Sequence, residues 1–278
     1  MDDTAGPART FPPGVSSWID LEVPDVDAAA AFYGELFGWS VADVTPPGVP
    51  ERYAVATLDG RDAAAIAWGE GPPRWRTYVA TDDVDASLAR AVELGGQVLA
   101  PAADAGPGGR GAAFTDPFGS ELRLWQARAR LGAQVANVPG AWNFSNLRTT
   151  DVAASARYYR DLFGWELVDQ GWATAIQVPG YGDHLESTVD PDIRTRQAHA
   201  PEGFADTIGA MVPAQDRDPG WYVVFTVADC EATAAAAARL GGTVVESLST
   251  DWTREAVLRD PQGATFTASQ FTPPSDWD

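Results

Sequence analysis

Three segments of the chain, 18–23, 121–125 and 222–227, alternate apolar residues with residues that are mostly charged, polar or aromatic. The charged, polar and aromatic residues are the candidates for chemistry. In the segment 121–125, Glu121, Arg123 and Trp125 alternate with two leucines. Successive side chains of a β-strand point to opposite faces, so the pattern predicts a strand with one apolar face and one polar face. The predicted polar face of the first half of the chain contains Trp18, Asp20, Glu22, Arg76, Tyr78, Glu121, Arg123 and Trp125.

This set of charges and rings suggests two kinds of chemistry. Arginines can hold a carboxylate or phosphate through forked hydrogen bonds, so Arg76 and Arg123 are candidate ligand-binding residues, with Trp18 and Trp125 as flanking rings. A carboxylate beside apolar rings can act as a general acid or base. The candidate catalytic residues are Glu121, Asp20 and Tyr78. In the alternative interpretation, the arginines only neutralise these carboxylates in a buried salt network.

The corresponding face in the second half of the chain is more neutral and rich in hydroxyl groups. It suits a polar, uncharged or aromatic ligand held by stacking and hydrogen bonds, although a water-filled cleft would have the same composition. The candidate ligand-binding residues are Phe144, Asn146, Arg148, Tyr222 and Thr267.

The elements that position these residues are predicted from an internal repeat. FYGELFGW (32–39) recurs as YYRDLFGW (158–165), and DPFGSELRLWQ (116–126) recurs as DPQGATFTASQ (260–270). An aspartate precedes each predicted helix as an N-cap, and a glycine follows it as a stop. The pattern predicts strand–helix–strand–strand–strand four times, and therefore an α+β fold built by duplication.

The repeat also predicts the organisation of the domains. We expect a disordered tail over 1–12, a first domain over 13–130, a linker over 131–141, a second domain over 142–272 and a tail over 273–278. The second domain carries a turn-rich insertion over 180–204. It would act either as a lid over the polar inner face of one domain or as a spacer between the domains.

The net charge and the cysteine content limit the possible binding partners and the cellular compartment. A formal net charge of −20 disfavours nucleic acid and anionic membranes. The single cysteine, Cys230, excludes an intrachain disulfide, and the N-terminal sequence lacks the pattern of a signal peptide. We therefore expect a cytoplasmic protein whose partner is a small molecule. We also expect a monomer or a weak homodimer.

These motifs together resemble the vicinal oxygen chelate superfamily, which includes glyoxalase I, extradiol dioxygenases and bleomycin-resistance proteins. Asp-initiated helices ending in FY..LFGW, then LGG, then DP.G carry the resemblance over nearly the whole chain. It implies two tandem glyoxalase-like domains, in which four βαβββ modules form two curved mixed sheets with helices outside. It does not define an activity, because one fold hosts many functions.

The resemblance also implies where a divalent metal would bind. The corresponding positions in this sequence hold Trp18, Arg76 and Arg123 in the first domain, and Phe144, Tyr222 and Thr267 in the second. None is a usual ligand for such an ion, so we expect neither a metal nor another cofactor. The predicted function is metal-independent binding of a small, aromatic or acidic organic molecule. The alternative is an enzyme of the lyase, isomerase or dioxygenase type using the acid–base residues of the first domain. If it is an enzyme, a metal-independent lyase or isomerase is favoured over a dioxygenase or glyoxalase I.

Overall fold

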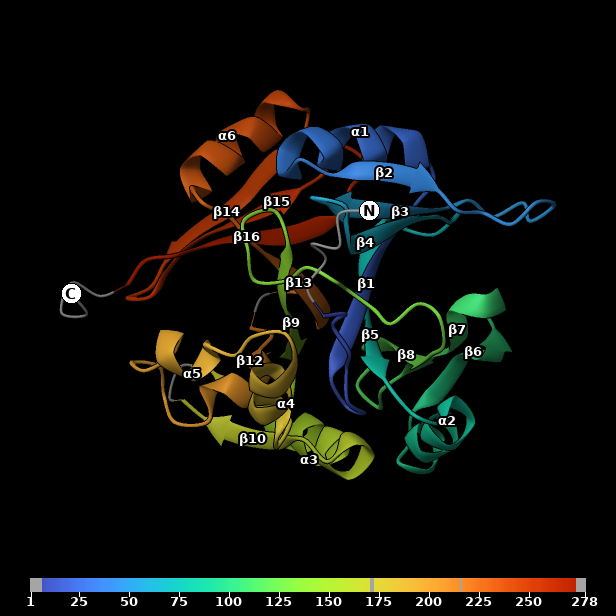
Figure 1. The fold of residues 1–278 in the computed structure, drawn as a ribbon, viewed down its shortest axis with the longest axis vertical. Helices are drawn as coiled ribbons and strands as arrows, with labels where there is room; N and C mark the ends of the chain where they lie inside the picture. The colour runs from blue at the N-terminus through green and yellow to red at the C-terminus, as the bar shows by residue number, and fades with distance from the viewer. Residues whose placement is uncertain (1–6, 171–172, 216, 274–278) are drawn as a thin grey trace. The chain divides into compact units, whose positions relative to one another are not determined.

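The computed structural model describes residues 7–170, 173–215 and 217–273. Its elements follow one another as four modules of strand, helix and three strands, which confirms the predicted repeat (Figure 1). The first module is β1 (Ser16–Val23), α1 (Val26–Phe37), β2 (Ser40–Asp43), β3 (Tyr53–Leu58) and β4 (Arg61–Trp68). The second is β5 (Arg74–Ala80), α2 (Val84–Glu93), β6 (Gln97–Asp104), the short 3₁₀ helix η1 (Gly106–Gly108), β7 (Gly109–Thr115) and β8 (Glu121–Ala127).

The third and fourth modules repeat this order, with additions in the third. The third is β9 (Trp142–Thr149), α3 (Val152–Phe163), β10 (Glu166–Asp169), β11 (Thr174–Gln177), α4 (Tyr181–Thr188), α5 (Ile193–Arg196), η2 (Phe204–Asp206) and β12 (Thr207–Pro213). The fourth is β13 (Gly220–Thr226), α6 (Cys230–Arg239), β14 (Thr243–Ser249), β15 (Thr253–Arg259) and β16 (Thr265–Phe271). The segment predicted as an insertion, 180–204, thus contains α4 and α5. No helix in the described part of the chain is long and apolar enough to cross a membrane.

The strands form two mixed sheets, as the α+β prediction requires. The strand orders are β2-β3-β4-β1-β5-β8-β7-β6 and β10-β11-β12-β9-β13-β16-β15-β14. In the first sheet β1 pairs in parallel with β4, and β5 pairs in parallel with β8, while the pairs joined by short connections are antiparallel. The second sheet repeats this pattern. The two sheets therefore have the same topology.

The repeated octets end their helices as predicted. Asp25 caps α1 by accepting a hydrogen bond from the amide of Ala28, and Asp151 caps α3 in the same way. Gly38 and Gly164 follow these helices with φ angles of 74° and 73°, in the left-handed region that glycine tolerates best.

Contacts divide the chain into two compact units, and each unit draws on both copies of the repeat. The first unit contains the described residues of 1–17, 77–132 and 145–221, so it combines the second module with the third. The second unit contains those of 18–76, 133–144 and 222–278, so it combines the first module with the fourth. The two copies follow one another along the chain, but each compact unit is formed by one module from each copy.

One buried hydrogen-bonded trio holds together the two modules of each unit. In the first unit, the Tyr159 hydroxyl of α3 donates to Asp116 Oδ2 at 2.9 Å, and Trp221 Nε1 donates to that hydroxyl at 3.1 Å. In the second unit, Tyr33, Asp260 and Trp75 make the equivalent bonds at 3.0 and 3.2 Å. The tyrosine of each octet thus binds the aspartate of a DP.G turn from the other copy.

The ends of the chain lie partly outside the described residues. These include residues 1–6 of the tail predicted over 1–12, and residues 274–278 of the C-terminal tail. Within the first unit, Arg9 and Thr10 contact α4: Arg9 Nη2 donates to the Tyr181 hydroxyl at 3.3 Å, and Thr10 Oγ1 lies 3.1 Å from His184 Nε2.

Candidate functional site

The polar face of β5 and β8 brings three predicted site residues into direct contact in the first unit. The two strands pair in register, with Tyr78 opposite Arg123 and Ala80 opposite Trp125. Arg123 Nη1 donates to the Tyr78 hydroxyl at 2.9 Å, and Arg123 Nε donates to Glu121 Oε1 at 3.3 Å. The guanidinium carbon also lies 5.5 Å from the centre of the Tyr78 ring, within the range of a cation–π contact.

These contacts orient Arg123 without burying it. The Arg123 side chain is 23% exposed and that of Glu121 is 16% exposed, while Tyr78 is buried. A guanidinium that is held in one orientation and still meets solvent can bind a carboxylate or phosphate with little loss of side-chain entropy. Glu121 already accepts a hydrogen bond from Arg123, so an incoming anion would share the guanidinium with it.

Trp125 extends this cluster beyond Arg123. Its ring meets that of Tyr78 edge to face at 6.3 Å, and its Nε1 donates to the carbonyl of Arg130 at 2.9 Å. The indole lies against the glycines at the start of β7. A Cβ atom added to Gly109 would lie 2.7 Å from Trp125 Cζ2 and 2.6 Å from the carbonyl oxygen of Gln126, so only glycine leaves the ring its place. The glycine-rich segment that precedes β8 therefore has a packing role.

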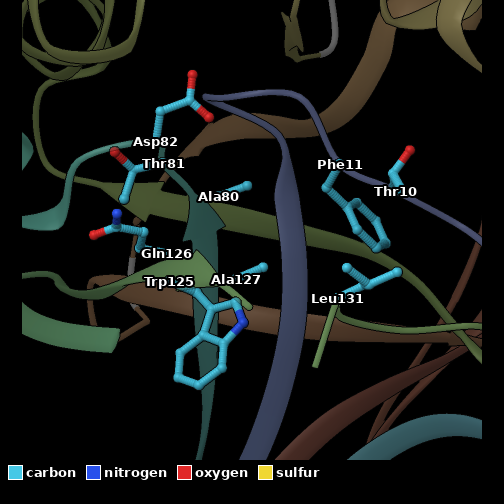
Figure 2. Close-up of a pocket in the computed structure, with 9 residues that line it drawn as sticks. All are labelled: Thr10, Phe11, Ala80, Thr81, Asp82, Trp125, Gln126, Ala127 and Leu131. Atoms are coloured by element: carbon cyan, nitrogen blue, oxygen red, sulfur yellow. The ribbon is translucent and has the colours of Figure 1, made fainter. Parts of the chain in front are cut away.

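Trp125 also lines a pocket of about 200 Å³. Ala80, Thr81 and Asp82 line it from the end of β5, and Trp125, Gln126 and Ala127 line it from the end of β8 (Figure 2). The remaining lining residues are Thr10, Phe11 and Leu131. An engineered protein cavity of roughly 150 Å³ holds one benzene molecule, so this pocket has room for a single ring with a small substituent.

The other candidates from the first half of the chain lie in the second unit. Trp18 is buried and its Nε1 donates to the Tyr53 hydroxyl at 3.0 Å. Asp20 is 1% exposed. Arg76 is also buried and forms an ion pair with Glu22, in which Nη2 donates to Oε1 at 2.7 Å. Each of the two arginines thus has its own carboxylate. Arg76, with its side chain 6% exposed, matches the alternative of a buried salt bridge.

The candidates from the second half of the chain are divided between the units. Asn146 and Arg148 lie on β9 in the first unit, and Asn146 Oδ1 accepts a hydrogen bond from the amide of Ala210 at 2.8 Å. Phe144, Tyr222 and Thr267 lie in the second unit. Phe144 and Tyr222 are partly exposed, whereas Thr267 is buried on β16, where it pairs in register with Val224.

A divalent metal does not fit the residues at the positions that the resemblance indicates. Arg76 and Arg123 are permanent cations that already pair with carboxylates, and Trp18 and Phe144 have no metal-binding atom. Over residues 7–170, 173–215 and 217–273, no group of three histidine, cysteine, aspartate or glutamate side chains is close enough to hold an ion. The set of donors suits an organic anion better than a cation.

Sequence reasoning missed the walls of the pocket. Phe11 and Leu131 fall in segments that were predicted as tail and linker, and Gln126 lies just beyond the alternating run of β8. The aromatic character of Phe11, in a segment 1–14 without another aromatic residue, was the available signal. Nothing in the sequence indicated which part of the fold it contacts.

Comparison with known proteins gives two matches to family models. Residues 16–124 match the glyoxalase/bleomycin resistance protein/dioxygenase superfamily, and residues 144–269 match a glyoxalase-like domain. The chain is 37% identical over 269 residues to "Putative glyoxylase CFP32" of Mycobacterium tuberculosis (strain CDC 1551 / Oshkosh), covering 94% of this chain and 96% of the relative. It is 35% identical over 279 residues to the anthracycline biosynthesis protein DauV of Streptomyces sp. (strain C5), covering 94% of each.

Solved structures show the same fold at low sequence identity. The Mn(II)-bound glyoxalase from Novosphingobium aromaticivorans superposes with a TM-score of 0.60 at 14% identity, covering 94% of this chain and 84% of that one. The 2,3-dioxygenase LapB from Pseudomonas sp. KL28 superposes with a TM-score of 0.59 at 12% identity, covering 99% and 97%.

Proposed function

The chain belongs to the glyoxalase/bleomycin resistance protein/dioxygenase superfamily, and from this premise we propose that it binds a small aromatic acid, without a metal ion, against Tyr78, Arg123 and Trp125. The acid group pairs with the guanidinium of Arg123. The ring enters the pocket and packs on the indole of Trp125.

The observation that carries the proposal is the position of Arg123. Its guanidinium is held by Tyr78 and Glu121 and remains 23% exposed. On the same face of β8, two residues further along, Trp125 forms the wall of a pocket of about 200 Å³. A cation next to a one-ring pocket favours a ligand that carries both a ring and an acid group.

The name of one relative supports an aromatic ligand, and the name of another leaves a catalytic role as an alternative. DauV is named for anthracycline biosynthesis, and CFP32 carries a glyoxylase name. A polycyclic anthracycline is larger than the pocket, so we expect such a molecule to enter with one end only. Metal independence is supported by the chemistry of the donors, because the arginines would repel a divalent ion.

The first test is a calorimetric titration with salicylate, a single ring with a carboxylate. We expect binding that is unchanged by a chelator. Arg123→Gln and Trp125→Ala should each weaken binding by roughly tenfold or more, since each removes a charged hydrogen bond or a stacking surface. Arg90→Gln, which alters an exposed arginine on α2, is the matched control and should bind as the unmodified protein does.

The titration also has outcomes that reject the proposal. Binding that appears only after addition of Zn²⁺, Mn²⁺ or Fe²⁺ would overturn the metal-independent site. Equal affinity in Arg123→Gln and Arg90→Gln would place the acid group elsewhere.

An acid–base enzyme is the second candidate, because Glu121 and the Tyr78 hydroxyl both contact Arg123 beside the pocket. In this role Glu121 would be the base, and Arg123 or Tyr78 would stabilise developing negative charge. Asp20, the other predicted base, is 1% exposed in the second unit. A spectral change of an anthracycline on incubation with the protein, lost in Glu121→Gln, would favour this candidate. No change over many protein equivalents would discard it for that substrate.

A further inference from the structure

One wall of the pocket comes from the N-terminal segment rather than from the sheet. We call residues 9–11 the N-terminal strap. Thr10 and Phe11 line the pocket (Figure 2). They belong to no strand, since the first strand begins only at Ser16. The strap therefore depends on side-chain contacts for its position.

The contacts that hold the strap come from α4, in the segment predicted as an insertion. Arg9 Nη2 donates to the Tyr181 hydroxyl at 3.3 Å. His184 Nε2 lies 3.0 Å from the carbonyl oxygen of Thr10 and 3.1 Å from its hydroxyl. The rings of Tyr181 and His184 are stacked at 6.3 Å, so the two anchors form one surface of the helix. The insertion thus reaches the pocket through the strap.

Phe11 is the apolar residue of the strap that lines the pocket. Its ring packs against the buried core of the first unit, and the guanidinium of Arg9 lies 5.8 Å from the ring centre. A Cβ atom added to Gly132 would lie 2.8 Å from Phe11 Cε2, and Gly132 has a φ of +118°. Close approach of the chain at Gly132 therefore fixes the depth at which the ring sits.

The strap joins the sheet through a defined bend. Pro12 and Pro13 are followed by Gly14, which has a φ of +86°. Beyond the bend the chain is held by the sheet, where the amide of Gly14 donates to the carbonyl of Ala80 at 2.9 Å. Before the bend, Arg9 and His184 are partly exposed and Thr10 is exposed, although Tyr181 is buried. The hydrogen bonds that would break first are those between the strap and α4.

We propose that the N-terminal strap is a movable wall of the ligand pocket and that Tyr181 and His184 of α4 are positioning residues that keep it closed. This inference rests on the proposed function for its biological meaning, since a closed wall matters only if the pocket binds a ligand. Phe11 then limits the length of the ring that fits, and release of the strap at Gly14 opens the pocket to longer aromatic molecules.

The test measures access to the pocket without any ligand. Ala80 lines the pocket and is 8% exposed, so Ala80→Cys places a thiol behind the strap. Its labelling by dithiobisnitrobenzoate should be slow. Adding His184→Ala or Tyr181→Phe should speed labelling by about fivefold, the effect of losing one hydrogen bond. The natural cysteine, Cys230, is buried, and its labelling in the unmodified protein is subtracted.

Arg196→Gln is the matched control, because Arg196 pairs with Asp190 within the same insertion. It should leave the labelling rate unchanged. If Ala80→Cys fails to fold, release of the fragment 1–9 by trypsin, which cleaves after Arg9, gives the same comparison in the otherwise unmodified chain. Equal rates in His184→Ala, Tyr181→Phe and Arg196→Gln would overturn the strap. Failure of salicylate to bind would overturn the proposed function and leave this result standing.

Discussion

At the scale of single residues, Arg123 shows how one side chain can be both neutralised and available. Its guanidinium carries five N–H donors in a fixed fork, and Tyr78 and Glu121 accept from two of its nitrogens. Lysine could not make the same contacts, because an ammonium group has no planar fork. The residue types at 78, 121 and 123 therefore form a unit, and a change in one alters what the others can bind.

Glu121→Gln tests how this unit treats an anion. The amide oxygen of glutamine can still accept from Arg123 Nε, so the guanidinium keeps its orientation while a negative charge is removed. We expect salicylate to bind about fivefold more tightly, because a like charge some 4 Å away is worth about 1 kcal/mol even in bulk water. Calorimetry at neutral pH measures the change. Weaker binding would show that the charge of Glu121, and not only its hydrogen bond, holds Arg123.

At the scale of elements, the buried trio explains why the octet and the DP.G turn recur together. Asp116 Oδ1 accepts from the amides of Phe118 and Ser120 and so shapes the turn before β8, while Oδ2 accepts from Tyr159 of α3. One carboxylate thus sets the turn that leads into Glu121 and Arg123 and ties it to a helix from the other copy. The positions of the site residues depend on this tie.

The pKa of Asp116 makes the tie dependent on pH. Burial raises this pKa above its ordinary value of 3.8, and hydrogen bonds from Ser120, Tyr159 and Phe118 oppose the shift. The folded protein therefore holds this proton more tightly than the unfolded chain does. The resulting stabilisation is fully present below the unfolded pKa and is lost as the pH rises through the folded pKa.

Asp116→Asn should remove this part of the pH dependence, because an amide does not titrate. We expect the melting temperature of the unmodified protein, relative to that of the variant, to fall as the pH is raised from about 4 towards 7. Thermal unfolding followed by circular dichroism at several pH values measures the difference. A difference that stays constant over this range, or that grows with pH, would contradict the direction of the shift.

At the scale of the whole molecule, the sequence was sufficient for the repeat but not for the way its copies combine. Alternation in β8, the capping aspartates and the stopping glycines are local signals, and each was confirmed, whereas β1 is buried on both faces. The partner of Tyr33 could not be predicted, because Asp116 and Asp260 occupy equivalent places in the two copies. Only the fold determines that Tyr33 binds Asp260.

The candidate site was predictable to the same degree. Alternation placed Tyr78, Glu121, Arg123 and Trp125 on one predicted face, and the register of β5 and β8 sets Tyr78 opposite Arg123. The sequence did not separate the partly exposed Arg123 from the buried Arg76, since both belong to the same alternating pattern. It could not place Phe11 either, because its ring meets Gly132 and shares a pocket with Trp125 and Leu131, which are distant in the sequence. The monomer or weak homodimer stays a prediction, which light scattering can test.

The net charge of −20 belongs to the molecule as a whole and opposes the local attraction of Arg123 for an acid. At low ionic strength the field of the protein reaches far into solution and repels an approaching anion. Added salt shortens the Debye length from about 30 Å at 0.01 M to about 8 Å at 0.15 M, which leaves the contact with Arg123 largely intact because that group is partly buried. We therefore expect the association rate of salicylate, measured by stopped-flow fluorescence, to rise as salt is added. Salicylamide, which has the same ring but no charge, is the control and should associate at a rate independent of salt. A rate for salicylate that falls with salt would mean that the local field of Arg123 dominates at long range, and that the acidic surface plays no part in selecting the ligand.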